Sequence, residues 1–403
     1  NPDYTMERLV RVAKDLRTVH RFNGYIHLKS IPGASRELVN EAGLYADRLS
    51  VNVEIPKEEK GKFHKLGIPT VVDWLIQQAI TQELTPVYEP QFSDSSFGFR
   101  PGRKAHDALK QCKAYADAGY VYVVDMDLEK FFGNVYQSEL VEVLSRSIKD
   151  GAVISLIHKY LNAGIMNHGI FERSETGAAQ GGPLSPLLSN VMLNELDKEL
   201  ERREHKFVRY ADDCMILCKS RRSAERTLES ITRYIERKRF LKVNREKTPA
   251  PYISRVKYLG YGFYRRKGKL RFRVHAKSAA KMKEKVRAIL DRNKLTPNAV
   301  RPIRLKQFIH GWVNDFKLID MKQLLMEVDT WIRRKIRAIY WKQWKKVRTR
   351  YRMMRQYAIS EWKVHELASC RKGLWRAALM LSSVLTNKEI ARPGYISMTS
   401  YYK

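Results

Sequence analysis

Two aspartates stand side by side, Asp212 and Asp213, between two short apolar runs at 207–210 and 214–217. This pattern predicts a β-hairpin whose turn carries two carboxylates. Adjacent carboxylates repel one another, and bound divalent cations are the usual reason for such a pair. An ordinary surface turn is the alternative for an isolated Asp-Asp, but apolar runs on both sides favour a hairpin rooted in a core. The sequence therefore predicts a metal site at this turn.

A further carboxylate is available from the segment Asp125-Met-Asp127, which directly follows the apolar run 121–124. If that run is a strand beside the hairpin, three carboxylates can hold two Mg²⁺ ions, with Mn²⁺ as the alternative metal, about 4 Å apart. One ion lowers the pKa of an attacking 3′-hydroxyl, and the other neutralises a triphosphate and its leaving pyrophosphate. The chemistry that fits this arrangement is nucleotidyl transfer.

The composition points to a polyanionic partner. The 403 residues include 76 Lys+Arg against 43 Asp+Glu, a formal net charge of +33, and nucleic acid is the commonest partner that neutralises such an excess. No run of 18 uncharged apolar residues is present, which argues against a membrane-spanning helix. The four cysteines form no Cys-x-x-Cys pair, so we expect neither zinc nor disulfides and a reducing, cytoplasmic compartment, with nucleoid association when the protein acts on DNA.

The chain changes character along its length. Residues 119–263 alternate strand and helix signals, and three leucines at helical spacing, Leu193, Leu196 and Leu200, predict a one-sided helix. Helices are also predicted at 71–84 and 36–50, the latter after a strand and a Pro-Gly turn. From 265 onward charge rises and helical periodicity dominates, with a connector at 294–302. The fold class is therefore α+β followed by an all-helical region.

A basic, aromatic-rich stretch lies at 331–355, with eleven Lys/Arg, five Trp/Tyr and no acid. Read as a helix, it could simply be solvated on one side and packed into a core through its aromatics. Basic charge interspersed with aromatics over this length favours a nucleic-acid face. The candidate RNA contacts are Arg333, Arg334, Lys342, Lys345 and Lys346.

Seven motifs, taken in order, resemble those of group II intron-encoded reverse transcriptases. They are Leu66-Gly-Ile-Pro-Thr70, Phe97-Gly-Phe-Arg-Pro101, Val124-Asp-Met-Asp-Leu-Glu-Lys-Phe-Phe132, Gln180-Gly-Gly-Pro-Leu-Ser-Pro186, Tyr210-Ala-Asp-Asp213, the pair Leu241-Lys-Val-Asn244 and Tyr258-Leu-Gly-Tyr-Gly-Phe263, and His310-Gly-Trp-Val-Asn314. The resemblance implies a right-hand polymerase fold with fingers (53–118), a palm with an antiparallel sheet (119–263), a helical thumb or maturase domain (264–355) and a short DNA-binding-like tail (356–403).

The resemblance also implies roles for single residues. Asp127 rather than Asp125 joins Asp212 and Asp213 as a catalytic metal ligand, because the family has an aromatic five residues after that aspartate. That aromatic is Phe132, whose ring would clash with a ribose 2′-hydroxyl and so select dNTPs; plain core packing is the alternative.

Other matched positions lie around the nucleotide and the template. Gln180 and Gly181 match the loop that supports the incoming base, an ordinary turn before a helix being the alternative. Lys247 and Arg100 are candidates for contacts to the template or to nucleotide phosphates, with plain solvation as the alternative. The family has an Arg before the Leu-Gly-Ile-Pro block, where this chain has His64 and Lys65. The candidates for the triphosphate and template contacts in the fingers are Lys57, Lys62 and Lys65.

The two ends of the chain depart from the family pattern. Residues 1–52 resemble a segment of a radical-SAM protein barrel but contain no cysteine, so they could hold no iron–sulfur cluster. We interpret them as a fused or read-through fragment without catalysis of its own. After residue 355 nothing resembles a His-Asn-His endonuclease, as in endonuclease-free members.

The resemblance implies an RNA-directed DNA polymerase that binds group II intron RNA, assists splicing and makes cDNA for intron mobility. Its partners would be intron RNA or another RNA template, a DNA primer or target and dNTPs, with no membrane and with a homodimer left open. Two alternatives stay open on the sequence: a free-standing reverse transcriptase of this type in DNA repair or defence, and a splicing-only maturase that binds RNA.

Overall fold

The computed structural model describes residues 2–22, 27–30, 35–46, 48–51, 71–126, 135–162, 165–167, 170–172, 182–238, 250–293, 296–357 and 359–402. The chain divides into two compact units. Unit 1 comprises Asn1–Gln111 and Val124–Ala250, and unit 2 comprises Cys112–Val123 and Pro251–Lys403. Each unit is therefore formed by two separate segments of the chain.

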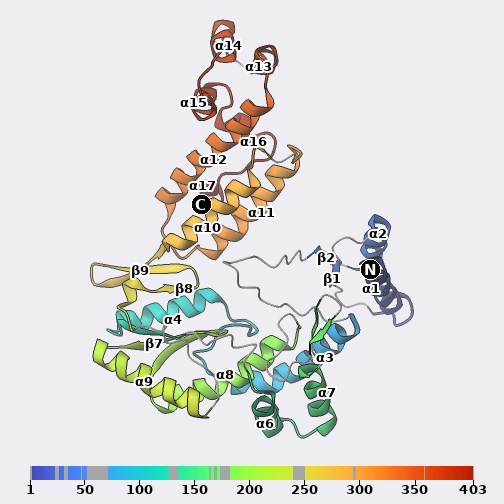
Figure 1. Ribbon diagram of the computed structural model, residues 1–403, viewed down its shortest axis with the longest axis vertical. Helices are drawn as coiled ribbons and strands as arrows, with labels where there is room; N and C mark the ends of the chain where they lie inside the picture. Colours follow the sequence, from blue (N-terminus) through green and yellow to red (C-terminus); the bar gives the residue numbers. More distant parts are fainter. Residues whose placement is uncertain are drawn as a thin grey trace. The chain divides into compact units, whose positions relative to one another are not determined.

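In unit 1 the elements are α1 (Pro2–Thr18), β1 (His27–Ser30), α2 (Arg36–Tyr45), β2 (Arg48–Val51), α3 (Val71–Tyr88), η1 (Glu89–Gln91), the start of α4 (Ala105–Asp117), the end of β3 (Tyr122–Met126), α6 (Gln137–Ser147), α7 (Gly151–Leu161), β4 (Ile165–Asn167), β5 (Ile170–Glu172), α8 (Ser185–Arg202), β6 (Lys206–Tyr210), β7 (Asp213–Cys218) and α9 (Arg221–Lys238) (Figure 1). In unit 2 they are η2 (Ile253–Arg255), β8 (Lys257–Tyr258), β9 (Tyr261–Arg266), β10 (Lys269–Val274), α10 (Ala276–Ile289), α11 (Val300–Asp315), α12 (Lys322–Gln343), α13 (Val347–Met354), α14 (Glu361–Ala368), α15 (Leu374–Met380), η3 (Leu381–Ser383), α16 (Asn387–Ala391) and α17 (Met398–Tyr401).

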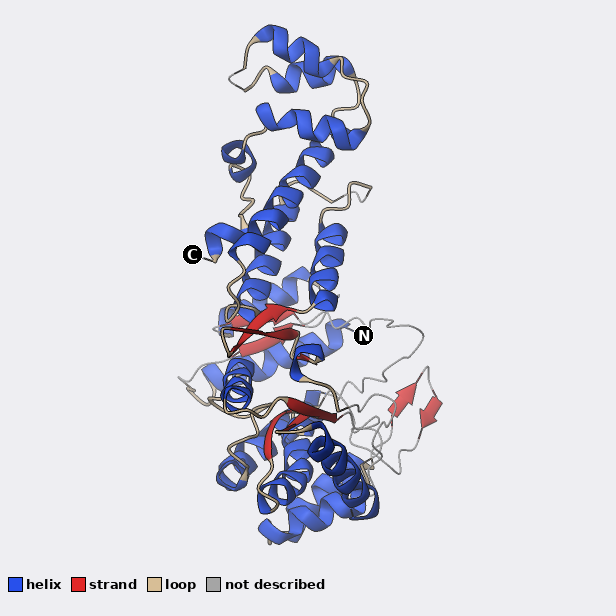
Figure 2. Cartoon of the chain, turned by 90° about the vertical axis from the view of Figure 1, so that its left-hand side faces the viewer, coloured by secondary structure: helices blue, strands red, loops and turns tan. Residues whose placement is uncertain are grey.

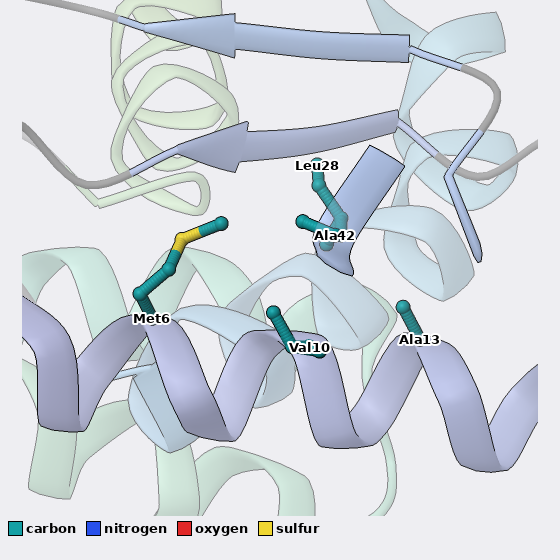
Figure 3. Packing of buried hydrophobic residues seen from close by; sticks show 5 residues of the cluster. All are labelled: Met6, Val10, Ala13, Leu28 and Ala42. Carbon is teal, nitrogen blue, oxygen red and sulfur yellow. The ribbon is translucent and has the colours of Figure 1, made fainter. Parts of the chain in front are cut away.

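The described residues between 2 and 51 form a small parallel βαβ motif preceded by a helix. β1 pairs in parallel with β2, and α2 provides the crossover that parallel neighbours require. Met6, Val10 and Ala13 of α1 point toward Leu28 of β1 and Ala42 of α2 and form a buried cluster with them (Figure 3). The helix predicted at 36–50 ends at Tyr45 instead, because its last residues pair as a strand.

The core of unit 1 is a three-stranded sheet in the order β3-β7-β6, covered by helices. The antiparallel hairpin β6–β7 confirms the sequence prediction for 207–217. α9 packs against β7 and α8 against β6. Leu193, Leu196 and Leu200 are all buried, which confirms the predicted helix, but α8 is one-sided only toward its end because residues 187–194 are buried on every side. α3 confirms the helix predicted at 71–84.

Unit 2 begins with a second antiparallel sheet, in the order β10-β9-β8. We expected helix from residue 264, and this was wrong for residues 264–274. Lys267 and Gly268 both have positive φ, 51° and 76°, and make the tight turn that suits a twisted hairpin. Apolar residues alternate with basic ones over 269–274, so the strand signal was present but masked by the charge.

From Ala276 onward the described part of unit 2 is helical (Figure 2), as predicted for a helical C-terminal region. The connector predicted at 294–302 ends earlier, since α11 begins at Val300 and Pro302 lies in its first turn, where a missing N–H has no consequence. The helix expected over 331–355 is broken after Gln343. Trp344 is buried there, and Arg350 donates from Nε to its carbonyl at 2.9 Å. No helix among the described residues is both long and apolar enough to cross a membrane.

The C-terminal residues are part of unit 2 and dock on α12. Asp329 is 2% exposed and accepts hydrogen bonds from the backbone N–H of Met398, at 2.7 Å, and of Thr399, at 2.9 Å. Its carboxylate thereby satisfies the first N–H groups of α17. Tyr401 stacks on His310 of α11 with ring centroids 4.1 Å apart. The tail at 356–403, expected as a separate element, therefore shares the core of unit 2.

Substitution of Asp329 by Ala should detach the C-terminal turn. The change leaves one buried and one half-buried N–H group without acceptors, and it should lower the free energy of unfolding by about 2–3 kcal/mol. Urea unfolding with limited proteolysis of the tail measures both effects. Glu327→Ala removes an exposed carboxylate from the same helix and should change neither; equal effects of the two variants would contradict the docking role of Asp329.

Candidate active site

The two aspartates of the sequence pattern lie on the turn that joins β6 to β7. Tyr210 pairs with Asp213 across the hairpin, so Ala211 and Asp212 form a two-residue turn. The side chains of Asp212 and Asp213 are exposed, while the five residues after them are buried. The carboxylates therefore stand where a buried strand reaches the surface.

β3 lies beside β7 in the same sheet and brings Asp125 near the hairpin. Burial is the largest cause that raises the pKa of the Cys214 thiol well above its usual range. The carboxylate of Asp197 adds to it, followed by those of Asp125 and Asp213, and the charge of Arg209 opposes it. Cys214, Cys218 and Cys112 are buried.

The donor set suits a hard divalent cation. Carboxylate oxygens are the ligands that Mg²⁺ and Mn²⁺ prefer, and Asp212 and Asp213 offer them at an exposed turn. Within the described ranges no three His, Cys, Asp or Glu side chains gather as a metal site. The third ligand expected from the sequence, Asp127, lies outside those ranges, so the complete triad remains a prediction.

A loop from the Phe97-Gly-Phe-Arg-Pro101 motif docks along β6. The Arg209 N–H donates to the Ser95 carbonyl, and the Phe97 N–H donates to the Arg209 carbonyl, both at 2.9 Å. Gly98 then lies so close to the turn that a Cβ on it would be 2.2 Å from the Ala211 nitrogen. Only glycine permits this approach.

Ala211 itself is held in a strained conformation. Its φ is +56°, in the left-handed region that residues with a Cβ rarely adopt. Such a residue costs about 1–3 kcal/mol and persists only where the surroundings enforce it. The residue before the two aspartates is therefore fixed by its packing rather than by its own preference.

Arg100, a candidate for a template or nucleotide contact, is buried inside its own loop. Its guanidinium pairs with Glu89 at 2.8 Å and donates to the carbonyls of Ser93 and Ser96 at 2.5 and 2.9 Å. A phosphate contact would require it to leave these partners. We interpret Arg100 as the side chain that folds the loop against the hairpin.

Sequence reasoning missed a buried polar cluster beneath the turn. It consists of Arg209, Asp197 and Asn190, which are 0%, 0% and 1% exposed. Arg209 interrupts the apolar run 207–210, and Asp197 lies beside the buried leucines of α8. A charge inside an apolar run, matched by one on the buried face of a helix, is the signal that could have identified this pair.

The basic stretch 331–355 is partly structural. Trp341 and Trp344 are buried, which agrees with the alternative that the aromatics of this stretch pack into a core. The Arg334 guanidinium lies 4.1 Å from the centroid of the Trp375 ring. Lys345 and Lys346 are exposed at the break between α12 and α13. Of the remaining candidates, Lys342 is bonded to Asn293 and Arg333 to Thr330.

Eight candidate residues lie outside the described ranges and keep the roles that the sequence predicts for them. They are Asp127, Phe132, Gln180, Gly181, Lys247, Lys57, Lys62 and Lys65.

Comparison with known families identifies two matches. The family described as reverse transcriptase (RNA-dependent DNA polymerase) matches residues 55–263, more than half of the chain, and the group II intron maturase-specific domain matches residues 279–358.

Among individual proteins, the Escherichia coli (strain K12) protein YkfC is 30% identical over 251 residues, covering 53% of this chain and 66% of that protein. The group II intron-encoded protein LtrA of Lactococcus lactis is 39% identical over 167 residues, covering 41% of this chain and 28% of that protein. A solved telomerase from Candida tropicalis, in complex with a fragment of telomeric RNA, has a TM-score of 0.44 at 13% identity and covers 85% of this chain and 59% of that one. The chain thus spans less than two thirds of the length of each.

Substitution of Gly98 by Ala should displace the hairpin turn. The new Cβ would meet backbone, which cannot swing away, so we expect a loss of about 1–3 kcal/mol in the free energy of unfolding. Alkylation of Cys214 under native conditions, followed by mass spectrometry, should accelerate more than that of Cys218 at the far end of β7. Gly151→Ala, where a Cβ meets nothing within 4 Å, is the control; unchanged Cys214 reactivity in Gly98→Ala would refute the close approach.

Proposed function

The chain belongs to the reverse transcriptase family, in its group II intron-encoded branch, and from this premise we propose that it is an RNA-directed DNA polymerase that also binds group II intron RNA. The observation that carries the proposal is the exposed Asp212–Asp213 pair on the β6–β7 turn, inside the matched family region. Its products would be cDNA copies of RNA, made from dNTPs on a DNA primer or target.

Catalysis by this chain would depend on where it holds the carboxylates. Two Mg²⁺ ions, bound by Asp127, Asp212 and Asp213, would supply charge neutralisation and hydroxyl activation for nucleotidyl transfer. Asp213 is the first residue of β7 and is anchored by pairing with Tyr210, while Asp212 extends from the turn into solvent. This rigid placement supports the proposal, because preorganised carboxylates lose little free energy when the reacting groups arrive.

The intron-binding half of the proposal rests on unit 2. The maturase-specific match covers α10 to α13 and extends just past them, to residue 358, and this region has exposed Lys345 and Lys346 next to a buried aromatic core. Lysines on a rigid helical support can contact RNA phosphates, and structured intron RNA offers shape and 2′-hydroxyls besides. We propose that splicing assistance and cDNA synthesis for intron mobility use the same protein.

The maturase-specific match favours the intron enzyme over a free-standing repair or defence polymerase. The intact carboxylate pair argues against a maturase that only assists splicing. The altered residues before Leu-Gly-Ile-Pro, His64 and Lys65, bear on how the triphosphate is held and not on the metal ligands.

Primer extension tests the polymerase activity. With poly(rA)/oligo(dT), dTTP and Mg²⁺, we expect extension by the unaltered protein and a fall of about 100-fold or more in Asp212→Asn, because the metal pair then has one ligand fewer. Asp320→Asn, at an exposed aspartate of unit 2, is the charge-matched control and should retain full activity. Full extension by Asp212→Asn would show that the site is assigned wrongly.

The salt dependence of RNA binding tests the basic surface. In the double variant Lys345→Gln/Lys346→Gln, the slope of log K against log salt should become shallower by about 0.7–0.9 for each RNA phosphate that the protein no longer neutralises. The charge-preserving variant Lys345→Arg/Lys346→Arg should keep the slope. An unchanged slope in the glutamine variant would mean that RNA binds elsewhere.

A further inference from the structure

The polar cluster beneath the turn is a fully buried ion pair. Arg209 of β6 donates from Nε to both carboxylate oxygens of Asp197 on α8, at 2.8 and 3.0 Å, and from Nη2 at 2.6 Å. Neither side chain is exposed to solvent. A buried pair of this kind often stabilises a protein no better than apolar side chains of similar size. Its presence therefore calls for a purpose other than stability.

The remaining arm of the guanidinium reaches the turn. Arg209 Nη1 donates to the carbonyl oxygen of Ala211 at 2.9 Å and to Oδ1 of Asn190 at 2.9 Å. The Ala211 carbonyl belongs to the peptide that joins it to Asp212. The guanidinium thus holds the peptide directly before the two carboxylates, at the residue whose φ is +56°.

Asn190 closes the arrangement from the other side. Its Nδ2 donates to the Gly98 carbonyl at 2.9 Å, and Gly98 is the residue that abuts the Ala211 nitrogen. The strained residue is therefore contacted at its carbonyl by Arg209 and at its nitrogen by Gly98. Asn190 couples these two contacts through its amide.

The identity of the charged residue matters for this geometry. The flat guanidinium of Arg209 bonds to Asp197 and Ala211 together, because its donors point in fixed, divergent directions. A lysine could pair with the Asp197 carboxylate, but its single ammonium group could not also reach the Ala211 carbonyl. A role limited to joining β6 to α8 would not need the contact with the turn.

We propose that Arg209, Asp197 and Asn190 are positioning residues that fix the Ala211 peptide and thereby set the placement of Asp212 and Asp213 for divalent cations. This inference rests on the proposed function, since it concerns the same carboxylates. It adds that cation affinity depends on a buried cluster that touches neither metal nor substrate. Small displacements of such ligands are enough to lower rates by about 100-fold.

Two asparagines on α8 make a matched test. Asn190 and Asn194 are both buried, lie one helical turn apart and both bond to the docked loop. Asn194 donates to the Gln91 carbonyl at 3.0 Å and accepts from the Ser93 N–H at 3.3 Å. Of the two, Asn190 is the one whose amide bonds to Arg209.

Mn²⁺ affinity, measured by electron paramagnetic resonance without any substrate, is the first readout. In Asn190→Ala we expect Kd for Mn²⁺ to rise about 10-fold and kcat of primer extension to fall about 100-fold with little change in KM for dTTP. Asn194→Ala should stay within about twofold of the unaltered protein in both, although it loses similar stability. Equal effects of the two variants, or none on Mn²⁺ affinity, would overturn the proposal.

The accessibility of Cys214 gives a second readout that needs neither metal nor polymerase. Cys214 is directly opposite Arg209 in the hairpin register and is buried. Its alkylation should accelerate about 10-fold in Asn190→Ala relative to Cys218, which is buried at the far end of the same strand and reports general loosening of unit 1. If the unaltered protein binds Mn²⁺ and shows these differences but extends no primer, the polymerase proposal fails while the positioning role stands.

A second variant covers the case in which Asn190→Ala does not fold. The double variant Arg209→Met/Asp197→Leu replaces the ion pair by apolar side chains of similar size, a change that proteins often tolerate. We expect a folded protein whose Mn²⁺ affinity is about 10-fold weaker, because no side chain then holds the Ala211 carbonyl. Unchanged Mn²⁺ affinity in that folded variant would show that the cluster is only structural.

Discussion

Two adjacent carboxylates repel one another, and the segments around the β6–β7 turn must hold them in place. Asp212 is the second residue of the two-residue turn and Asp213 is the first residue of β7, so the two carboxylates are adjacent in the chain. The turn is held by three other segments, namely α8, the docked loop at 93–100 and β6, which meet at Ala211 through hydrogen bonds and close packing. Buried charge and backbone strain are concentrated within a few residues of the exposed carboxylates. This is the distribution expected of a site whose geometry is fixed before its ligands arrive.

Sequence reasoning found the carboxylate turn because its signal is local. Apolar runs on both sides of Asp212 and Asp213 indicate a hairpin, and a short turn then fixes which residues are exposed. Arg209 and Asp197 were missed because they lie twelve residues apart on different elements. Each charge stands out among apolar neighbours, but their spacing alone does not show that the two side chains pair. Arg100 was misleading for the opposite reason. Its place in a family motif made it a candidate for a phosphate contact, with plain solvation as the alternative, yet it is bonded to Glu89 and to carbonyls of its own loop.

In unit 2, likewise, the number of basic residues in the sequence does not show which of them are exposed. A net charge of +33 suggests a broad nucleic-acid face, but part of the positive charge stabilises the fold. The Arg350 guanidinium lies 4.0 Å from the centroid of the Trp341 ring, and Arg337 is mostly buried, with Nε donating to the Leu385 carbonyl at 2.8 Å. High charge also masked β10, whose basic residues alternate with apolar ones. The basic residues that remain exposed, such as Lys345 and Lys346, are the ones relevant to a polyanion.

The presence of alanine at the strained position of the turn has a physical rationale. Glycine would adopt a positive φ without cost, but it would also leave the peptide before Asp212 free to adopt many other conformations. Ala211 is restricted to a narrow region once its carbonyl is bound by Arg209 and its nitrogen is covered by Gly98. The backbone strain at Ala211 therefore accompanies a rigid turn. The glycine, Gly98, is found instead on the loop that must approach this turn closely. A buried ion pair of little net stability is then consistent with selection for placement of the carboxylates rather than for stability of the fold.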